Sequence, residues 1–180
     1  MLSLNPTAMD LSGWAADQYL HCPSVLTDRQ LSELRSWVDV LTDLPETPGK
    51  WMKYYERGDW ADRQLCRVED FVPYHEGLRA LICGTPTMET LERLMGEPAA
   101  LFKEKINFKL PGGAGFVAHQ DAPAFSTFGH RYHITMMLAV DDATIENGCL
   151  EVSDPVSIYT LLDQAEDGTI APHIIETLPW

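Results

Sequence analysis

Two segments near the middle of the 180-residue chain alternate between apolar and polar side chains, and they enclose a glycine-rich turn. In Glu104–Leu110 the apolar positions are Ile106, Phe108 and Leu110. The alternation recurs in Arg131–Val140, where both faces become apolar towards the end. Because successive side chains of a strand point to opposite faces, this period of two predicts two strands, the second buried on both sides. A chain of this kind must fold around a β-sheet.

Earlier segments predict helices instead. Thr27 and Gln30 have the spacing of a capping box, and apolar residues follow at helical period, which predicts a helix over about 28–44. Shorter helices are expected over 75–82 and after Thr85, taken as the cap residue. Two amphipathic helices before the strong strand pattern indicate a helical layer that packs on the sheet.

Two further patterns indicate extended structure. The run RQLCRVEDFV predicts a short strand or extended segment. Asn147-Gly148 is the strongest hairpin signal in the chain, and it predicts a turn that leads into a strand over Cys149–Val152.

Length and charge limit the classes of function. The chain is long enough for one compact domain over 1–180. A net charge of -14 argues against a nucleic-acid or anionic-membrane surface, so small molecules are the expected partners. The four cysteines lack Cys-x-x-Cys spacing, which argues against a zinc ribbon or a redox dithiol. No signal peptide or membrane span is apparent, so a cytoplasmic location is expected.

The tripeptide His119-Gln120-Asp121 carries the candidate chemistry. In an extended strand His119 and Asp121 share one face and can converge on one point. An imidazole nitrogen and a carboxylate oxygen form a ligand pair for a divalent metal, and one more histidine would complete the two-histidine, one-carboxylate triad of non-haem Fe(II) oxygenases. Such a tripeptide arises easily by chance, so its position between a glycine-rich turn and a predicted strand is what supports this interpretation.

Four runs of the chain resemble the phytanoyl-CoA dioxygenase-like family of Fe(II)/2-oxoglutarate oxygenases: KINFKLPGG, HQD, YHITMMLAVDD and ENGCLEV. A looser similarity extends upstream through RVEDFVPYHEGL and METLERLMGEPAALFKEK. The resemblance implies an α+β fold, in which a helix-rich part over 1–100 packs on a double-stranded β-helix, or jelly-roll barrel, formed from 101–180.

The resemblance also implies a reaction and a set of site residues. Fe(II) would be held by His119 and Asp121, while 2-oxoglutarate and dioxygen are consumed, succinate and carbon dioxide are released, and a small organic substrate is hydroxylated. Asn107 and Thr135 are candidates for contacts to 2-oxoglutarate, and Lys105 is a candidate for the cosubstrate or for an anionic substrate. The sequences of these runs are similar to those of bacterial members that act on small molecules, including hydroxylases of aminoalkyl phosphonates.

The chain departs from the family pattern after residue 152. The family carries a second ligand histidine on a later strand, followed by an arginine that pairs with the far carboxylate of 2-oxoglutarate. Here no arginine follows Arg131, SDPVS stands where relatives have a Pro-Gly-Ser-His turn, and His173 lies in an unrelated context. We therefore expect a truncated chain that lacks its last barrel strands and turns over 2-oxoglutarate poorly or not at all. His21, His75 and His130 are expected to be surface or cap residues. His133 shares a predicted face with Thr135 and could approach the pocket, although the role of a hydrogen-bonded structural histidine is favoured.

Two other classes of protein stay open at this point. One is a jelly-roll module that keeps a ligand pocket but no working iron site. The other is a dinucleotide-binding oxidoreductase, because the six residues from Gly113 to Ala118 match Gly-x-Gly-x-x-Ala. That fingerprint needs a helix that begins at the glycines, and the residues that follow contain Pro123 and Gly129. No such helix is expected.

Overall fold

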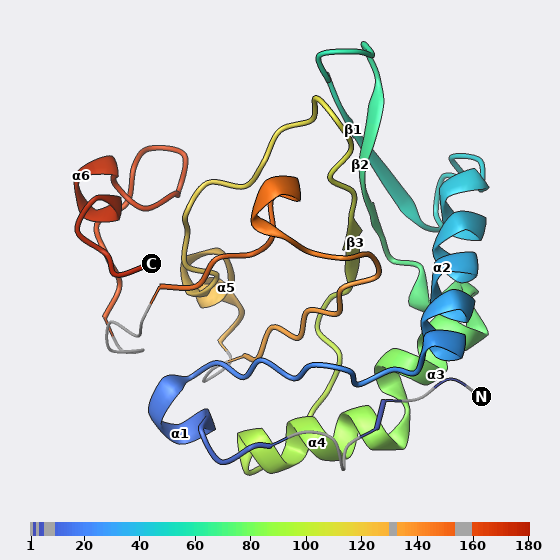
Figure 1. The fold of residues 1–180 in the computed structure, drawn as a ribbon, viewed down its shortest axis with the longest axis horizontal. Helices are drawn as coiled ribbons and strands as arrows, with labels where there is room; N and C mark the ends of the chain where they lie inside the picture. Colours follow the sequence, from blue (N-terminus) through green and yellow to red (C-terminus); the bar gives the residue numbers. More distant parts are fainter. Residues whose placement is uncertain (1, 3, 6–9, 130–132, 154–159) are drawn as a thin grey trace. The chain divides into compact units, whose positions relative to one another are not determined.

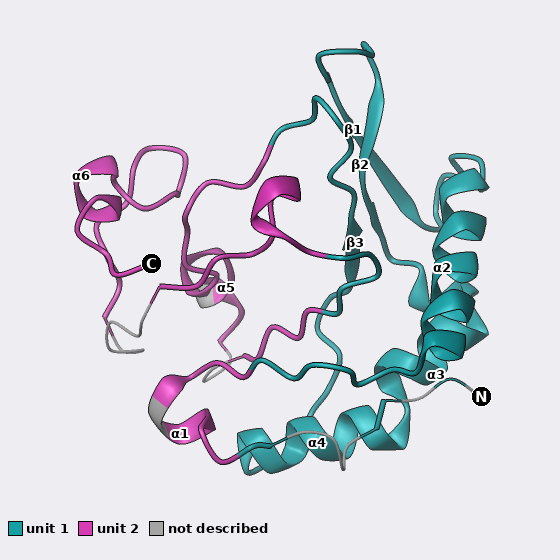
Figure 2. Cartoon of the chain, viewed as in Figure 1, with its two compact units in different colours: residues 1–11, 21–114, 138–142 teal, residues 12–20, 115–137, 143–180 magenta. Residues whose placement is uncertain are grey.

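The structure, a computed structural model, describes residues 2, 4–5, 10–129, 133–153 and 160–180. These residues form two compact units (Figure 2). Unit 1 comprises residues 1–11, 21–114 and 138–142, and unit 2 comprises residues 12–20, 115–137 and 143–180. The expectation of a single domain over 1–180 stays a prediction, and each unit is described by itself.

The longest helix of unit 1 is α2 (Asp28–Asp43), which agrees with the predicted helix over 28–44 (Figure 1). Its capping box is formed as the sequence indicates: the Thr27 side chain accepts from the Gln30 backbone N–H, and the Gln30 side chain accepts from the Thr27 backbone N–H. Leu34, Val38 and Leu41 lie on the buried face of α2 at helical spacing.

Helices α3 (Glu76–Cys83) and α4 (Thr85–Met95) are both formed. His75 caps α3, since its Nδ1 accepts from the Leu78 backbone N–H at 3.1 Å, which confirms its expected cap role. The prediction that Thr85 caps α4 was wrong. Gly84 occupies the cap position without a side-chain bond, and Thr85 is the first helical residue.

The sheet of unit 1 has the strands β1 (Met52–Glu56), β2 (Gln64–Glu69) and β3 (Lys105–Asn107) in the order β1-β2-β3, with both pairs antiparallel. β2 confirms the predicted extended segment, and β3 is shorter than the predicted strand over 104–110. Val68 pairs with Ile106 on the face turned towards the core, so their neighbours Arg67 and Asn107 lie on the opposite face.

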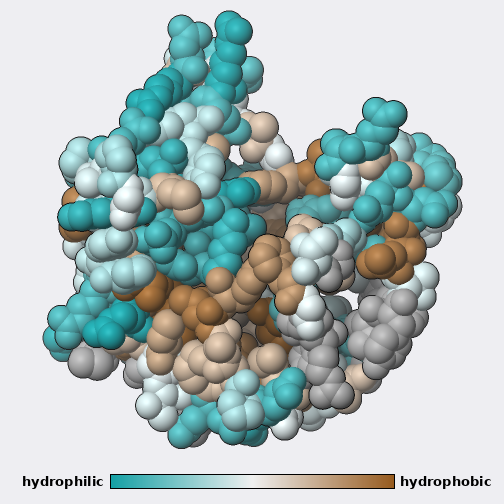
Figure 3. Space-filling view, turned by 180° about the vertical axis from the view of Figure 1, so that it is seen from behind, coloured by the Kyte–Doolittle hydropathy of each residue, from teal (hydrophilic) through white to brown (hydrophobic). Residues whose placement is uncertain are grey.

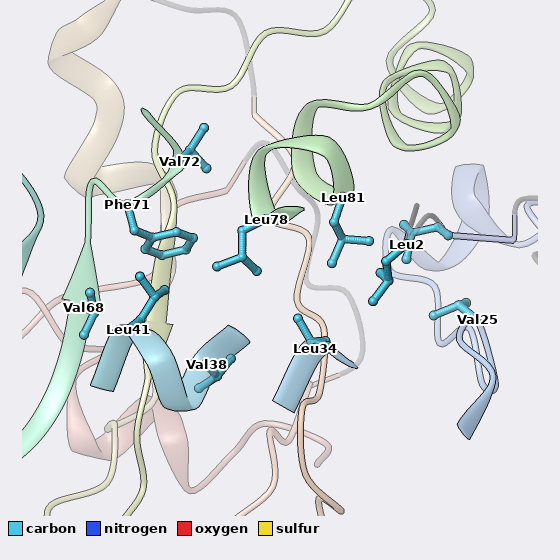
Figure 4. Close-up of a cluster of buried hydrophobic side chains, with 11 residues drawn as sticks. Leu2, Val25, Leu34, Val38, Leu41, Val68, Phe71, Val72, Leu78 and Leu81 are labelled. Carbon is cyan, nitrogen blue, oxygen red and sulfur yellow. The ribbon is translucent and has the colours of Figure 1, made fainter. Parts of the chain in front are cut away.

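A single hydrophobic cluster joins these elements. Val68 of β2 lies beside Leu41 of α2 and Phe71, and Leu78 and Leu81 of α3 extend the same cluster (Figure 4). Val68 is fully buried, which agrees with the alternation of its strand. Phe71 is followed by the short 3-10 helix η2 (Val72–Tyr74), which leads into α3. The outer surfaces of α2 and of the β1–β2 hairpin are hydrophilic (Figure 3).

Unit 2 consists of short helices joined by long irregular segments. Its helices are α1 (Trp14–Asp17), α5 (Ala122–Phe125), η3 (Ser126–Phe128), η4 (Ile145–Asn147) and α6 (Pro172–Ile175). The described part of unit 2 contains no β-strand beyond an isolated bridge between Gln164 and Ile170. The backbone N–H of Ile170 also donates to the Ala118 carbonyl at 2.9 Å, which ties the last segment to the residues before His119.

Two strand predictions were wrong for the described residues. In the predicted strand over 131–140, residues 131 and 132 lie outside the described part, and residues 133–140 form no strand. Leu138 and Val140 nevertheless pack against the core of unit 1, so their apolar character reflects burial. Asn147-Gly148 forms no hairpin. Gly148 takes a left-handed conformation at φ 79° that ends η4, a conformation shared by helix caps and hairpin turns.

The observed α+β composition agrees with the predicted fold class. No helix in the described residues combines the length and the apolar character needed to cross a membrane.

Candidate functional site

His119 lies in the irregular segment that precedes α5, and a backbone contact fixes its ring. Its Nδ1 lies 2.7 Å from the carbonyl oxygen of Val117. A carbonyl oxygen only accepts hydrogen bonds, so Nδ1 must carry the hydrogen of the neutral ring. Nε2 therefore keeps its lone pair and is the nitrogen that can bind a metal. This backbone partner is typical of a metal-ligating histidine.

Asp121 directs one carboxylate oxygen towards that nitrogen. Its Oδ1 lies 3.5 Å from His119 Nε2. Its other oxygen, Oδ2, accepts from the Thr135 hydroxyl at 2.7 Å. The hydrogen bond to Oδ2 therefore fixes the carboxylate while Oδ1 faces the imidazole. The two side chains converge, as the sequence predicts, although no β-strand forms here.

The pair fits a divalent cation. Imidazole nitrogen and carboxylate oxygen bind first-row divalent ions at about 2.0–2.2 Å, so two atoms 3.5 Å apart can both contact one ion. Both side chains are partly exposed, at 45% and 37% of their surface, so an ion can reach them. Within the described residues, however, no group of three or more His, Cys, Asp or Glu side chains is assembled. The described residues therefore bring together one histidine and one carboxylate that could hold a metal.

Gln120 anchors the segment between the two candidate ligands. Its Nε2 donates to the Thr160 carbonyl at 3.1 Å, and its Oε1 accepts from the Leu162 backbone N–H at 2.8 Å. Our sequence reasoning missed this residue. The sequence did contain a signal for it. In an extended segment the middle residue of His-x-Asp points to the side opposite the two candidate ligands. An amide there has both a donor and an acceptor for backbone groups.

The remaining predicted site residues fall in both units. Thr135 belongs to unit 2 and contacts Asp121, so the structure joins it to the candidate metal ligands. Lys105 and Asn107 belong to β3 in unit 1, where both are exposed. The Oδ1 of Asn107 accepts from the Arg67 Nε at 3.0 Å. Arg67 was also missed, because its run gives no clean alternation of polar and apolar residues.

The other described histidines have separate contacts or lie apart. His133 makes an edge-to-face contact with Phe125, with ring centroids 4.8 Å apart. His173 lies in α6 and joins no metal-binding group among the described residues. His130 lies outside the described residues. The contact with Phe125 agrees with the structural role that the sequence favours for His133.

The glycine-rich turn does not begin a helix. Residues 112–117 are irregular, and the next helix, α5, begins at Ala122. A dinucleotide fingerprint needs the amide groups of a helix that starts at the glycines. The structure therefore does not favour the dinucleotide-binding alternative.

Comparison with known proteins decides the family. The model of the phytanoyl-CoA dioxygenase (PhyH) family matches residues 16–153. The chain belongs to the phytanoyl-CoA dioxygenase family. Members of this family use Fe(II) and 2-oxoglutarate, which confirms the expected cofactors and does not favour the metal-free binding module.

Several curated relatives are similar over most of the chain. A 2-aminoethylphosphonate dioxygenase from an uncultured bacterium is 46% identical over 168 residues, which cover 93% of this chain and 64% of the relative. A methylphosphonate hydroxylase from Gimesia maris is 38% identical over 179 residues, which cover 98% of this chain and 68% of the relative. A probable alpha-ketoglutarate-dependent hypophosphite dioxygenase from Stutzerimonas stutzeri is 32% identical over 53% of this chain and 34% of its own length.

The chain thus spans 64% of the length of the 2-aminoethylphosphonate dioxygenase. No solved structure matches the chain.

Proposed function

We propose that the protein is an Fe(II)- and 2-oxoglutarate-dependent dioxygenase that hydroxylates a small organic substrate. This proposal depends on one observation: His119 Nε2 and Asp121 Oδ1 lie 3.5 Å apart. A hydrogen bond on the other atom of each group fixes its orientation. Family membership supports the same reaction class.

His119 and Asp121 would hold Fe(II), which, with 2-oxoglutarate and dioxygen bound, supplies the oxidising power for hydroxylation and releases succinate and carbon dioxide. The chain's own residues orient the ligands. The Val117 carbonyl fixes the tautomer of the His119 ring, and the Thr135 hydroxyl fixes the rotation of the Asp121 carboxylate. Asn107 and Lys105 remain the proposed contacts for 2-oxoglutarate, through donors that suit a carboxylate. Thr135, the third predicted contact, has one hydroxyl hydrogen and donates it to Asp121.

An organophosphonate is the proposed substrate class. The relatives that are 46% and 38% identical are named for 2-aminoethylphosphonate and methylphosphonate. A phosphonate is recognised by cationic and amide donors, and Lys105 and Asn107 present both kinds from one strand.

We also propose that β1, β2 and β3 form part of a double-stranded β-helix, the cupin-like jelly roll of the family. The antiparallel order of the three strands and the helices packed on one face support this. The cytoplasmic location stays a prediction.

The first test is metal binding. Anaerobic titration of the 180-residue chain with Fe(II) should give binding that His119→Ala and Asp121→Ala abolish, while His173→Ala binds as the unaltered chain does. Binding that survives in both ligand variants would contradict the metal assignment.

The second test is turnover. Succinate release should be iron-dependent for a fusion that joins this chain to the part of the 2-aminoethylphosphonate dioxygenase that it does not cover. In that fusion either ligand substitution should abolish succinate release, and full activity in either variant would refute the proposed function.

A further inference from the structure

The tip of the β1–β2 hairpin lies against the turn formed by residues 110–113, which we call the glycine turn (Figure 1). The Asp59 backbone N–H donates to the Gly112 carbonyl at 2.9 Å. The turn itself is closed by the Gly113 N–H, which donates to the Leu110 carbonyl at 3.0 Å. All these groups belong to unit 1, so the hairpin holds the turn within one unit.

Gly113 is packed so closely that no side chain fits there. Glu56 and Gln64 form the last pair of β1 and β2 before the hairpin loop, and both side chains reach Gly113. A Cβ atom on Gly113 would collide with Glu56 Oε1 and would lie 2.8 Å from Gln64 Nε2. Gln64 is only 8% exposed, so its side chain has little space to move aside.

The two side-chain atoms that contact Gly113 are costly to bury. Glu56 Oε1 and Gln64 Nε2 are both buried and have no hydrogen-bond partner among the described residues. An unpaired buried polar atom lowers stability, and an apolar pair would fill the same position at lower cost. The position of these side chains against the turn therefore indicates a role other than stability.

Gly112 makes the second close contact. It takes a left-handed conformation at φ 75°, and a Cβ atom on it would lie 2.5 Å from Cδ1 of the Trp60 ring. Gly96 has nearly the same conformation, at φ 73°, but nothing lies within 4 Å of its Cβ position. A side chain at Gly112 would thus meet both backbone strain and the Trp60 ring, whereas one at Gly96 would meet strain alone.

The glycine turn begins the segment that carries the first candidate metal ligand. Only a few residues separate Gly113 from His119, and the Val117 carbonyl among them lies 2.7 Å from His119 Nδ1. The end of this segment is fixed as well, because the Ala118 carbonyl accepts from the Ile170 backbone N–H at 2.9 Å. A short chain that is fixed at both ends has few paths, so the start of the segment limits where the Val117 carbonyl can lie.

We call Glu56, Gln64 and Trp60 the hairpin clamp. We infer that the hairpin clamp positions His119: it fixes the glycine turn, and the turn sets the path that brings the Val117 carbonyl to the imidazole. The three residues are positioning residues, since they act through the turn. Their effect on metal binding rests on the proposed function, whereas their effect on the His119 ring does not.

The first test compares two substitutions in the same loop. Gly113→Ala places a methyl group against Glu56 and Gln64, whereas nothing lies within 4 Å of the methyl group of Gly115→Ala, two residues nearer to His119. The metal-free 180-residue chain is studied at about pH 8, where imidazole rings are neutral, and nitrogen NMR shows which ring nitrogen carries the hydrogen. The unaltered chain and Gly115→Ala should show hydrogen on Nδ1 of His119, and Gly113→Ala should show a mixture of the two tautomers. Hydrogen on Nδ1 alone in a folded Gly113→Ala would overturn the inference.

Fe(II) affinity is the second measurement. Anaerobic titration should show binding about tenfold weaker in Gly113→Ala than in Gly115→Ala, as is typical when a group that orients a metal ligand is lost. Equal affinities would overturn the inference. If the unaltered chain binds no Fe(II) while the tautomer still depends on Gly113, the hairpin clamp is supported and the proposed function fails.

Removal of the obstructing side chain tests the contact itself. Glu56→Ala, added to Gly113→Ala, makes room for the new methyl group and should restore part of the Fe(II) affinity and most of the Nδ1-protonated form of His119. A double variant no better than Gly113→Ala would show that the contact with Glu56 is not the cause.

Trp60 provides a test that does not depend on the folding of Gly113→Ala. The Trp60 side chain is 82% exposed, so Trp60→Ala should fold normally, yet Fe(II) affinity should fall severalfold; Trp180→Ala, at another exposed tryptophan, should bind as the unaltered chain does. Gly112→Ala should weaken Fe(II) binding, whereas Gly96→Ala, with the same backbone strain, should not. Equal affinities within both pairs of variants would overturn the inference.

Discussion

Unit 1 buries eleven apolar side chains in one cluster, whereas Ile170 and Ala171 are the buried apolar residues in the described part of unit 2. Unit 1 has long helices and a sheet, and its elements are joined by packing. In unit 2 the candidate site is held by individual hydrogen bonds to His119, Gln120 and Asp121. The difference indicates that stability and site geometry depend on different interactions, so substitutions should separate the two.

The largest expected effect is in the core of unit 1. Phe71 is 1% exposed, and Phe71→Ala should lower the free energy of unfolding by about 3–5 kcal/mol, because it removes a ring and leaves a cavity. Chemical denaturation measures this loss. Ile145→Ala, at a unit 2 residue that is 81% exposed, is the control and should change stability by less than about 0.5 kcal/mol. Similar losses of stability in both variants would contradict the conclusion that stability depends on the core of unit 1.

The next effect sharpens the role of hydrogen bonds in unit 2. Thr135→Val removes the hydroxyl that donates to Asp121, and Fe(II) affinity should fall about 10- to 100-fold while the unfolding curve stays unchanged. Anaerobic titration measures the affinity, and Thr135→Ser should retain it. Thr169→Val is the matched control: Thr169 donates to Asp167 at 2.6 Å, and this bond holds the pKa of the Asp167 carboxyl below its usual value. If the control lowers metal affinity equally, the role of Thr135 is not specific.

A smaller effect concerns the end of α2. The Lys53 ammonium donates to the carbonyls of Thr42 and Leu44 at 2.6 and 2.5 Å, groups that have no partner within the helix. Lys53→Met should reduce the free energy of unfolding by about 1–2 kcal/mol. Thermal melting compares it with Lys105→Met, which removes the same charge from an exposed strand residue and should leave stability nearly unchanged. Equal losses would mean that charge alone matters.

The smallest expected effect is at the start of α2. Thr27→Ala removes the acceptor for the Gln30 N–H and should cost about 1 kcal/mol, measured as a shift in the denaturation midpoint. Thr27→Ser keeps the hydroxyl and should retain most of the stability. A serine variant as unstable as the alanine variant would show that the methyl group, and not the cap, is responsible.

Local signals predicted the helices of unit 1 well. The capping box of Thr27 and the apolar spacing of Leu34, Val38 and Leu41 place α2 within one residue at each end, because caps and periodicity act between near neighbours. β2 was also indicated by its own residues. The structure of these elements is therefore determined by residues that are close together in the sequence.

The strand predicted over 131–140 failed for a different reason. Alternation reports which side chains are buried, whereas a strand also needs a neighbour to supply hydrogen bonds. Leu138 and Val140 are packed as the alternation indicates, yet residues 133–140 pair with no strand in the described part of the chain. Asn147-Gly148 likewise predicted correctly that Gly148 is left-handed, but the glycine ends the helix η4 and does not form a hairpin turn. A helix cap and a hairpin turn both need a glycine in the left-handed conformation, so the dipeptide alone cannot distinguish them.

The candidate site shows the same limit. The spacing of His119 and Asp121 predicted that they converge, although the strand expected to direct them does not form. Their hydrogen-bond partners Val117 and Thr135 could not be assigned from the sequence, because these contacts depend on how the loop folds. Spacing predicts which atoms can meet, and the fold determines what holds them there.

The bonds from the Gln120 amide to the backbone at Thr160 and Leu162 link the segment between the two candidate metal ligands to residues 40 and 42 places further along the chain. A proteolytic cut or an insertion at residues 160–162 would therefore let the imidazole and the carboxylate swing apart while both stay chemically intact. This distant stretch therefore controls how the two candidate ligands face each other, without contacting either side chain.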